Sequence, residues 1–244
     1  MAAEMGIDLS GLGIDTVAVS GEPGGAVPAT RALLCERFGV SHIADGYGLT
    51  EVFPLGGNCR HSTSIHLAGD CVIVECVAPD TGTPVPPGEV GELVYTNLVG
   101  DTQPLLRYRS RDLGRLSDSE PCECGRTLVR IERLEGRSDD MISYRGQNFF
   151  PSAVEQVVRE FAGISPEYRI VVDRRRTLAA LGVQVEVLAA GRDDPSLPDR
   201  LAEAIRRAVG VRARIEMLEP GALAAAGVAS GLKAKRVIEL GPEH

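Results

Sequence analysis

Short apolar runs alternate with turn residues along the first part of the chain. Residues 14–20 (IDTVAVS) form a β-branched run that ends at Gly-Glu-Pro-Gly-Gly, which predicts a strand followed by a loop. Pro28 opens an amphipathic segment, PATRALLCERFG, and Gly39 closes it, which predicts a helix. Residues 41–44 predict a second short strand. The strand–helix–strand order is typical of an α/β sheet.

The pattern changes near residue 71. Three runs, CVIVECVA, GELVYTNL and PLLRYRSRDLGRL, predict strands that are separated by turn signals such as DTGTPVPPG. After Asp139 the sequence predicts a small α+β unit, and GALAAAGVASG at 221–231 predicts a loop. The elements expected in this unit are a hairpin, helices at 152–161 and 197–209, and strands at 168–173, 181–189 and 211–218.

Composition narrows the function classes. The chain has 244 residues, 43% of them apolar, which suits one large or two modest domains with a sizeable core. A net charge of −8, with basic residues interspersed among acidic ones, argues against a nucleic-acid-binding surface. No apolar run is long enough for a membrane span and no secretion signal is visible, so a cytoplasmic protein is expected. Six cysteines in that setting favour thiols or metal ligands over disulfides.

Three separated motifs resemble the acyl-adenylate-forming (AMP-binding) superfamily. They are GYGLTE at 46–51, EGRSDDMISYRGQNFFPSAVE at 135–155 and SGLKAKR at 230–236. The branch that the chain resembles most is the phenylacetate–CoA ligases, and the resemblance covers nearly all of the chain. It implies an ATP-dependent, AMP-forming acid–CoA ligase that activates an aromatic or arylacetic acid as an acyl-adenylate and then as a thioester. The cofactors implied are ATP/AMP, Mg²⁺ and CoA.

The resemblance also implies a fold class of α/β and α+β. Residues 1–138 would be the C-terminal part of the large domain, with an α/β segment at 1–58 and a β-rich subdomain at 59–138. Residues 139–244 would be the small mobile C-terminal α+β domain. A Ser/Thr/Gly-rich phosphate loop, which precedes these segments in the family, is not found, so the N-terminal portion is expected to be lacking.

GYGLTE supplies the first candidate site residues. By resemblance, Tyr47 would stack on adenine, with Gly48 beside it. Thr50 would bond phosphate and Glu51 would hold Mg²⁺, since hard cations prefer carboxylate oxygen. An ordinary glycine-flanked turn is the alternative interpretation of these six residues.

Two further loops would meet the nucleoside. SGEPGG would place Glu22 and Pro23 against the adenine. In RYRSRD, at residues 107–112, Asp112 would accept hydrogen bonds from both ribose hydroxyls, since a carboxylate has two acceptor oxygens. Arg111 stands where the family has glycine, so a changed turn geometry is expected there. A surface strand with mixed charges is the alternative.

The hinge and the catalytic lysine come from the last two motifs. In EGRSDD, Arg137 would contact the nucleotide and Asp139 would be the hinge, about which the small domain rotates to bring loop 144–148 inward for thioester formation. In SGLKAKR, Lys233 would reach the α-phosphate during adenylation, although Lys235 is a nearby rival. The alternatives are an exposed salt-bridged turn and a basic tail.

The cysteines indicate a metal site. Cys-Glu-Cys-Gly is a tight turn with two thiols, and three thiolates with one imidazole complete a tetrahedral shell for a structural Zn²⁺. Phenylacetate–CoA ligase relatives share this arrangement. His61 is an alternative to the expected imidazole ligand, and Cys35, Cys71 and Cys76 are expected to lie outside the site. The expected ligands are Cys59, His66, Cys122 and Cys124.

Three functional hypotheses stay open. The first is a fragment or split-enzyme subunit of an AMP-forming carboxylate–CoA ligase, with a small carboxylic acid, ATP and CoA as partners. The second is an adenylate-forming enzyme with a non-CoA acceptor. The third is a non-catalytic, zinc-stabilised homologue with a binding or regulatory role. A separate polypeptide that supplies the N-terminal half and a homodimer are further partners left open, while neither nucleic acid nor a membrane is expected.

Overall fold

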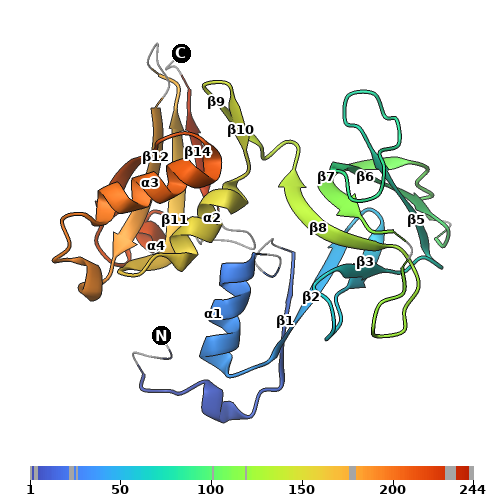
Figure 1. Ribbon diagram of the computed structural model, residues 1–244, viewed down its shortest axis with the longest axis horizontal. Coiled ribbons are helices and arrows are strands. Elements are labelled where there is room, and N and C mark those ends of the chain that lie inside the picture. Colours follow the sequence, from blue (N-terminus) through green and yellow to red (C-terminus); the bar gives the residue numbers. More distant parts are fainter. Residues whose placement is uncertain are drawn as a thin grey trace. The chain divides into compact units, whose positions relative to one another are not determined.

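The structure is a computed structural model that describes residues 2, 5–21, 25, 27–100, 102–118, 120–175, 180–228 and 235–241, except for the side chains of residues 53 and 54. The chain divides into two compact units, Met1–Asp139 and Asp140–His244 (Figure 1). Each unit has its own sheet and its own apolar core.

The strands described in the first unit form one eight-stranded sheet in the order β1-β2-β3-β4-β8-β7-β6-β5. β1 and β2 run parallel, and the other neighbouring pairs are antiparallel. The strands are β1 (Thr16–Ser20), β2 (His42–Leu49), β3 (Phe53–Gly57), β4 (Ile65–Leu67), β5 (Val72–Val77), β6 (Gly91–Asn97), β7 (Tyr108–Leu116) and β8 (Arg130–Arg137).

A helix joins the two parallel strands, as the sequence predicts. A short 3-10 helix, η1 (Ser10–Leu12), precedes β1, and α1 (Pro28–Phe38) lies between β1 and β2. Pro28 starts α1 because the first helical position needs no N–H donor. Gly39 ends the helix in the left-handed conformation, with φ +65°.

The core of the first unit lies in the antiparallel part of its sheet. Nine residues fill it, and the largest of them, Tyr95, is fully buried. Burial of these apolar side chains, at about 25 cal/mol per Å², is the main force that holds the strands together. The buried residues are Val52, Leu55, Ile65, Leu67, Val72, Cys76, Leu93, Tyr95 and Ile131.

β2 is longer than the sequence predicts. The expected strand ends at residue 44, whereas β2 continues to Leu49 and pairs with β3. Tyr47 and Gly48 therefore lie in a strand, and Thr50 and Glu51 lie in the turn that follows it. The register shifts between Tyr47 and Gly48, which marks a bulge beside this part of the strand.

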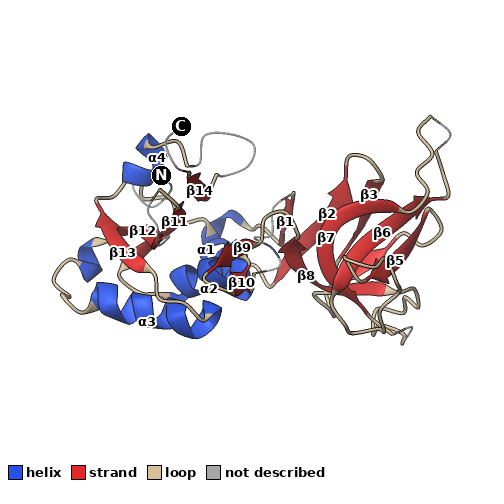
Figure 2. Cartoon of the chain, turned by 90° about the horizontal axis from the view of Figure 1, so that it is seen from above, coloured by secondary structure: helices blue, strands red, loops and turns tan. Residues whose placement is uncertain are grey.

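The second unit is an α+β fold with a four-stranded sheet in the order β13-β12-β11-β14 and a separate hairpin, β9-β10. Figure 2 shows α2 and α3 on one side of the four-stranded sheet and α4 on the other. The elements are β9 (Ile142–Tyr144), β10 (Gln147–Phe149), α2 (Pro151–Glu160), β11 (Ile164–Asp173), β12 (Ala180–Val187), η3 (Ala189–Gly191), α3 (Leu197–Val209), β13 (Arg214–Leu218), α4 (Ala222–Ala225) and β14 (Val237–Leu240).

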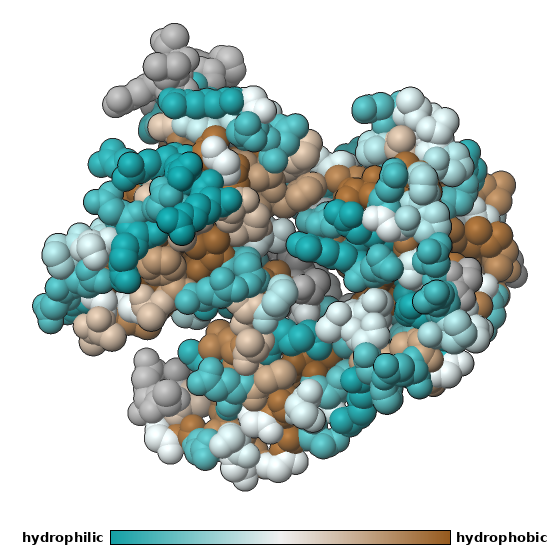
Figure 3. All heavy atoms as spheres, in the orientation of Figure 1, coloured by the Kyte–Doolittle hydropathy of each residue, from teal (hydrophilic) through white to brown (hydrophobic). Residues whose placement is uncertain are grey.

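Helix α3 buries one face in the core of this unit. Its apolar residues recur every four positions, and Leu197, Leu201, Ile205 and Val209 are all buried. Figure 3 shows hydrophilic side chains over the outer face of α3. On that helix Glu203 forms ion pairs with Arg206 and Arg207, at 2.7 and 3.2 Å. The period of the apolar positions thus explains why this helix has the bounds that the sequence predicts.

The second unit contains the hairpin that the sequence predicts. Arg145 and Gly146 both have positive φ, +50° and +79°, so they form the type I′ turn that suits a two-residue hairpin between β9 and β10.

The segment 221–231 is expected to be a loop, but its described part contains the four-residue helix α4. Glu186 on β12, which is buried, accepts a hydrogen bond from the backbone N–H of Leu223 in α4.

Candidate functional site

Three strands bring Tyr47, Asp112 and Arg137 together in the first unit. Asp112 on β7 and Arg137 on β8 are paired in register, and Tyr47 comes from β2. The Tyr47 hydroxyl donates a hydrogen bond of 2.5 Å to Asp112 Oδ2. An Arg137 guanidinium N–H donates to Asp112 Oδ1 at 3.3 Å. Asp112 is only 8% exposed, so these charge-assisted bonds stabilise a carboxylate that has lost most of its water.

Tyr95 extends this group into the core. Its hydroxyl donates to the hydroxyl oxygen of Tyr47 at 3.1 Å. Burial, followed by the nearby Tyr95 and Asp112, raises the pKa of Tyr47 well above its ordinary value. Burial likewise raises the pKa of Tyr95. Both phenols therefore keep their protons at neutral pH and act as hydrogen-bond donors.

Arg137 also bonds to the last residue of the first unit. Its Nε and a terminal N–H donate to the two carboxylate oxygens of Asp139, at 2.9 and 3.1 Å. This bidentate pair lowers the pKa of Asp139 below its ordinary value. Arg111 adds a longer contact to Asp139 at 3.4 Å. We call the five residues Tyr47, Tyr95, Asp112, Arg137 and Asp139 the Asp112 cluster.

Arg111 lies within β7 and has a left-handed backbone conformation. Its φ is +66°, in the left-handed region that glycine adopts most readily. Its backbone N–H donates to the buried Glu92 carboxylate at 3.1 Å, and Glu92 is also ion-paired to Arg109. An arginine therefore occupies, directly before Asp112, a backbone conformation that glycine adopts more readily.

Thr50 and Glu51 lie in the turn after β2. Both are exposed. Burial, together with the charge and hydrogen bond of the Glu51 carboxylate, raises the pKa of Tyr108, while Arg137 and Arg111 act in the opposite direction. Glu51 therefore lies beside Tyr108 of β7.

Some expected site residues are not brought together by the described structure. Glu22, Pro23 and Lys233 lie outside the described residues. Gly48 is exposed on β2. Segment 144–148 forms the hairpin between β9 and β10 in the second unit, with exposed side chains on its turn.

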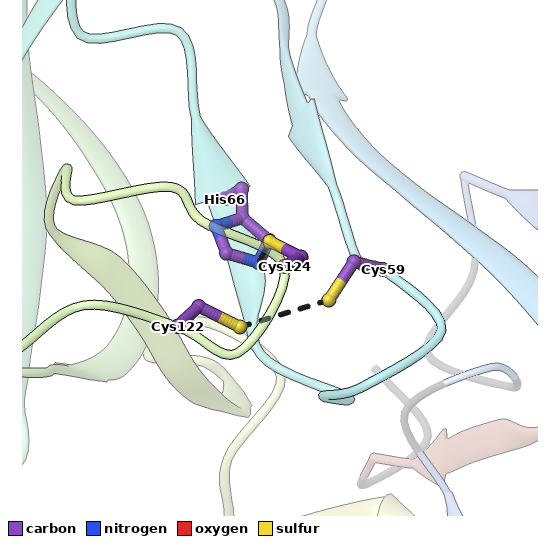
Figure 4. A group of neighbouring side chains, drawn as sticks. All are labelled: Cys59, His66, Cys122 and Cys124. Carbon is purple, nitrogen blue, oxygen red and sulfur yellow. Dashed lines mark hydrogen bonds between the residues drawn. The ribbon is translucent and has the colours of Figure 1, made fainter.

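Four side chains converge in a second group, which we call the Cys–His cluster. Cys59 follows β3, His66 lies on β4, and Cys122 and Cys124 come from the connection between β7 and β8 (Figure 4). One ligand atom from each of these residues lies within 4.8 Å of every other. The Cys122 turn is closed by hydrogen bonds between the backbones of Cys122, Gly125 and Arg126.

The spacing within the Cys–His cluster fits one tetrahedral metal ion. Zn–S and Zn–N bonds of about 2.3 and 2.05 Å predict S–S and S–N separations of about 3.8 and 3.6 Å in a tetrahedral shell. The Sγ atoms of Cys59 and Cys122 are 3.8 Å apart, and Cys124 Sγ is 3.6 Å from His66 Nε2. Burial of His66 lowers the pKa of its imidazole, which favours the neutral form that binds metals.

The alternative histidine is not part of this group. His61 is exposed and its Nδ1 lies 3.5 Å from a carboxylate oxygen of Glu123. Cys71 and Cys76 also lie outside the four-residue group.

Tyr95, Tyr108 and Glu92 are polar residues of β6 and β7 that sequence reasoning missed. A tyrosine within the apolar run GELVYTNL was the available signal, because a buried phenol needs a hydrogen-bond partner.

Comparisons with known proteins find related enzymes. A family model described as the AMP-binding enzyme C-terminal domain matches residues 146–240. The phenylacetate-coenzyme A ligase of Thermus thermophilus is 38% identical over 239 residues, which cover 88% of this chain and 53% of that protein. The phenylacetate-coenzyme A ligase of Escherichia coli (strain K12) is 41% identical over 169 residues, which cover 67% of this chain and 38% of that protein. The chain is a homologue of the phenylacetate–CoA ligases, and its residues 146–240 match the C-terminal domain of AMP-binding enzymes.

This phenylacetate–CoA ligase-like chain spans about half the length of the curated relatives it matches. Its fold agrees with the crystal structure of 2-hydroxyisobutyryl-CoA ligase in the postadenylation state in complex with R3-HIB-AMP. That structure gives a TM-score of 0.86 at 28% identity, over 98% of this chain and 51% of the other. The α/β and α+β fold class is thereby confirmed. Within the described ranges, no helix has the length and apolar character needed to cross a membrane.

Proposed function

We propose that this chain is the nucleotide-contacting and small-domain portion of an AMP-forming carboxylate–CoA ligase. The observation that supports it best is that Tyr47 and Arg137, which are far apart in the sequence, both donate hydrogen bonds to the buried carboxylate of Asp112. The names of the relatives, phenylacetate-coenzyme A ligases, favour an aromatic or arylacetic acid as the substrate class. The proposed cofactors, ATP and CoA, also favour a cytoplasmic location.

Three side chains of the Asp112 cluster each suit one part of a nucleotide. Asp112 would accept hydrogen bonds from the ribose hydroxyls, because an ionised carboxylate accepts several bonds at once. Tyr47 would offer its ring to the adenine, and its hydroxyl bond to Asp112 fixes the ring beside the ribose. Arg137 would contact the nucleotide with a guanidinium that Asp112 and Asp139 orient. Gly48, Glu22 and Pro23 would complete the nucleoside contacts.

The proposed reaction has two steps. A carboxylate oxygen of the acid attacks the α-phosphorus of ATP, and the bond to pyrophosphate breaks, which gives the acyl-adenylate. The CoA thiol then attacks the acyl carbon, loses its proton to solvent and releases AMP. Thr50 would bond phosphate and Lys233 would reach the α-phosphate. Mg²⁺, held by Glu51, would supply charge that offsets the phosphates.

The division of the chain suits a rotation between these two steps. The two compact units meet in sequence at Asp139 and Asp140, within the expected hinge. We propose domains at residues 1–138 and 139–244 that turn about Asp139. Release of its ion pairs with Arg137 and Arg111 would accompany the rotation. Hinge residues of this kind absorb a change in backbone angles while the domains stay rigid.

The Cys–His cluster is proposed to hold one structural Zn²⁺. Three thiolates and one imidazole are the donor set of closed zinc sites, and the two measured separations agree with a tetrahedral shell. Four protein ligands leave no open position, so the ion would cross-link β3, β4 and the β7–β8 connection instead of taking part in the reaction.

Binding of AMP to the chain tests the proposed site directly. Isothermal titration should detect AMP binding, and Asp112→Ala should weaken it about tenfold or more, because hydrogen bonds to a charged group are lost. Asp118→Ala is the matched control, since Asp118 is an exposed acid just after β7. Absence of binding by the unsubstituted chain would contradict the proposal and favour the non-catalytic alternative.

A second assay concerns the reaction and its partners. Pyrophosphate exchange is expected when a separate polypeptide that carries the family's phosphate loop is added, and it is not expected without that polypeptide. Transfer to CoA is then measured as thioester formation with phenylacetate. An acyl-adenylate that hydroxylamine traps but that gives no thioester when CoA is added would instead favour an adenylate-forming enzyme with another acceptor.

A further inference from the structure

Tyr95 is a buried polar side chain that the proposed site does not yet use. It lies on β6 and its side chain is completely buried in the core of the first unit. Its hydroxyl donates to another side chain, the hydroxyl of Tyr47, at 3.1 Å. Buried phenols need such a partner, and here the partner is a member of the candidate nucleotide site.

The hydrogen bonds between these side chains run in one direction. Tyr47 has a single hydroxyl proton, and it is used in the 2.5 Å bond to Asp112. The Tyr47 oxygen must therefore accept the proton of Tyr95. Donation from Tyr95 polarises the Tyr47 hydroxyl and strengthens its bond to Asp112, because hydrogen bonds in a chain reinforce one another.

The packing of the two rings adds a second constraint. Their centroids are 6.5 Å apart and their planes are tilted by 47°, which is within the range of contacting aromatic rings. Tyr95 is fully buried, whereas Tyr47 is partly exposed. The buried ring of Tyr95 thus packs against Tyr47 and holds its hydroxyl group in place.

We propose that Tyr95 is a positioning residue for nucleotide binding, which holds Tyr47 and, through it, the Asp112 carboxylate in the orientation that an adenosine monophosphate requires. The inference rests on the proposed function. Tyr95 touches no nucleotide in this arrangement and acts only through the Tyr47 hydroxyl. Preorganised groups of this kind improve affinity because ordering them costs less when the ligand binds.

Tyr95→Phe tests the proposal with AMP as the probe. It removes one hydroxyl and keeps the ring, and we expect the Kd for AMP to rise about fivefold, the effect of one hydrogen bond. Tyr168→Phe is the matched control. Tyr168 is also buried, its hydroxyl donates to Glu155 at 3.3 Å, and it lies in the second unit. This control should leave the Kd for AMP unchanged.

A double-mutant cycle separates positioning from general destabilisation. In a Tyr47→Phe background, Tyr95→Phe should have no further effect on the Kd for AMP, because its partner hydroxyl is gone. Equal weakening in both backgrounds would overturn the inference, as would an unchanged Kd in Tyr95→Phe alone. If the unsubstituted chain binds no AMP, the proposed function fails and the inference fails with it. Binding by the unsubstituted chain with no effect of Tyr95→Phe overturns the inference alone.

Discussion

The buried carboxylate of Glu92 accepts a hydrogen bond from the backbone N–H of Arg111 at 3.1 Å, and Arg111 has a φ of +66°. An L-residue with a side chain is disfavoured in that left-handed region by about 1–2 kcal/mol. Glu92 therefore helps to hold the strained backbone of β7 directly before Asp112. Strain of this kind at a candidate site has a measurable cost.

Arg111→Gly should make the first unit more stable by about 1 kcal/mol, because glycine adopts positive φ without strain. The exposed ion pair with Asp139 is lost, but surface pairs contribute little. Urea unfolding is the measurement. Arg111→Ala is the control, since it loses the same ion pair and keeps the strain. Equal stabilities for the glycine and alanine variants would show that the turn is not strained.

The Asp139 carboxylate should titrate below its ordinary pKa of 3.8, because Arg137 hydrogen-bonds to it. A folded-state pKa below the unfolded value means that the pair stabilises the fold above about pH 3.8, and that this contribution is lost as pH falls through the lower folded-state value. Carboxyl ¹³C NMR should show this midpoint.

Arg137→Gln is expected to raise the Asp139 midpoint toward the ordinary value. Arg133→Gln is the matched control, because Arg133 lies on the same strand and pairs with Glu135 instead. A midpoint that moves equally in both variants would mean that general surface charge, and not the bidentate pair, sets the titration.

Elemental analysis should find about one zinc per chain, the stoichiometry of a closed four-ligand site. A strong chelator should lower the thermal midpoint of the first unit by roughly 10 °C, which corresponds to about 3 kcal/mol. Cys124→Ser should lose the metal, whereas Cys71→Ser should keep it, since Cys71 lies outside the Cys–His cluster. Full zinc content in a Cys122→Ser, Cys124→Ser protein would refute the ligand set.

Glu186→Ala should loosen α4, because the buried carboxylate accepts the Leu223 N–H at 2.8 Å. Hydrogen exchange of the amides at 222–228 is expected to accelerate about tenfold, the effect of losing a bond to a charged acceptor. Glu186→Gln keeps an acceptor oxygen and should exchange more slowly than the alanine variant. Identical exchange in the two variants would show that another contact anchors α4.

The helices were predictable because their signals are local. Pro28 and Gly39 mark α1, and the four-residue period of α3 marks Leu197–Val209. β3 and β8 were not predicted. The sequence of β3 contains Pro54 and two glycines, and both exposed positions of β8, Glu132 and Arg133, are charged. The pairing of these strands therefore depends on neighbouring strands more than on local preference.

The candidate site was predictable only in part. Motif resemblance indicated Asp112 and Arg137 as nucleotide contacts, and the two residues are indeed adjacent on paired strands. The four members of the Cys–His cluster could be named because donor chemistry restricts the choice of candidate ligands. Tyr95 could not be found in this way, because its role depends on β6, β7 and β2 coming together in space.

The register of β7 against β8 has a practical consequence for sequence libraries. Asp112 pairs directly with Arg137, and side chains alternate between the faces of a strand. Inserting or deleting one residue in either strand would turn one of the two toward the opposite face, so these strands tolerate substitution but not changes in length. The exposed turn at residues 79–83, between β5 and β6, is a better place to vary loop length.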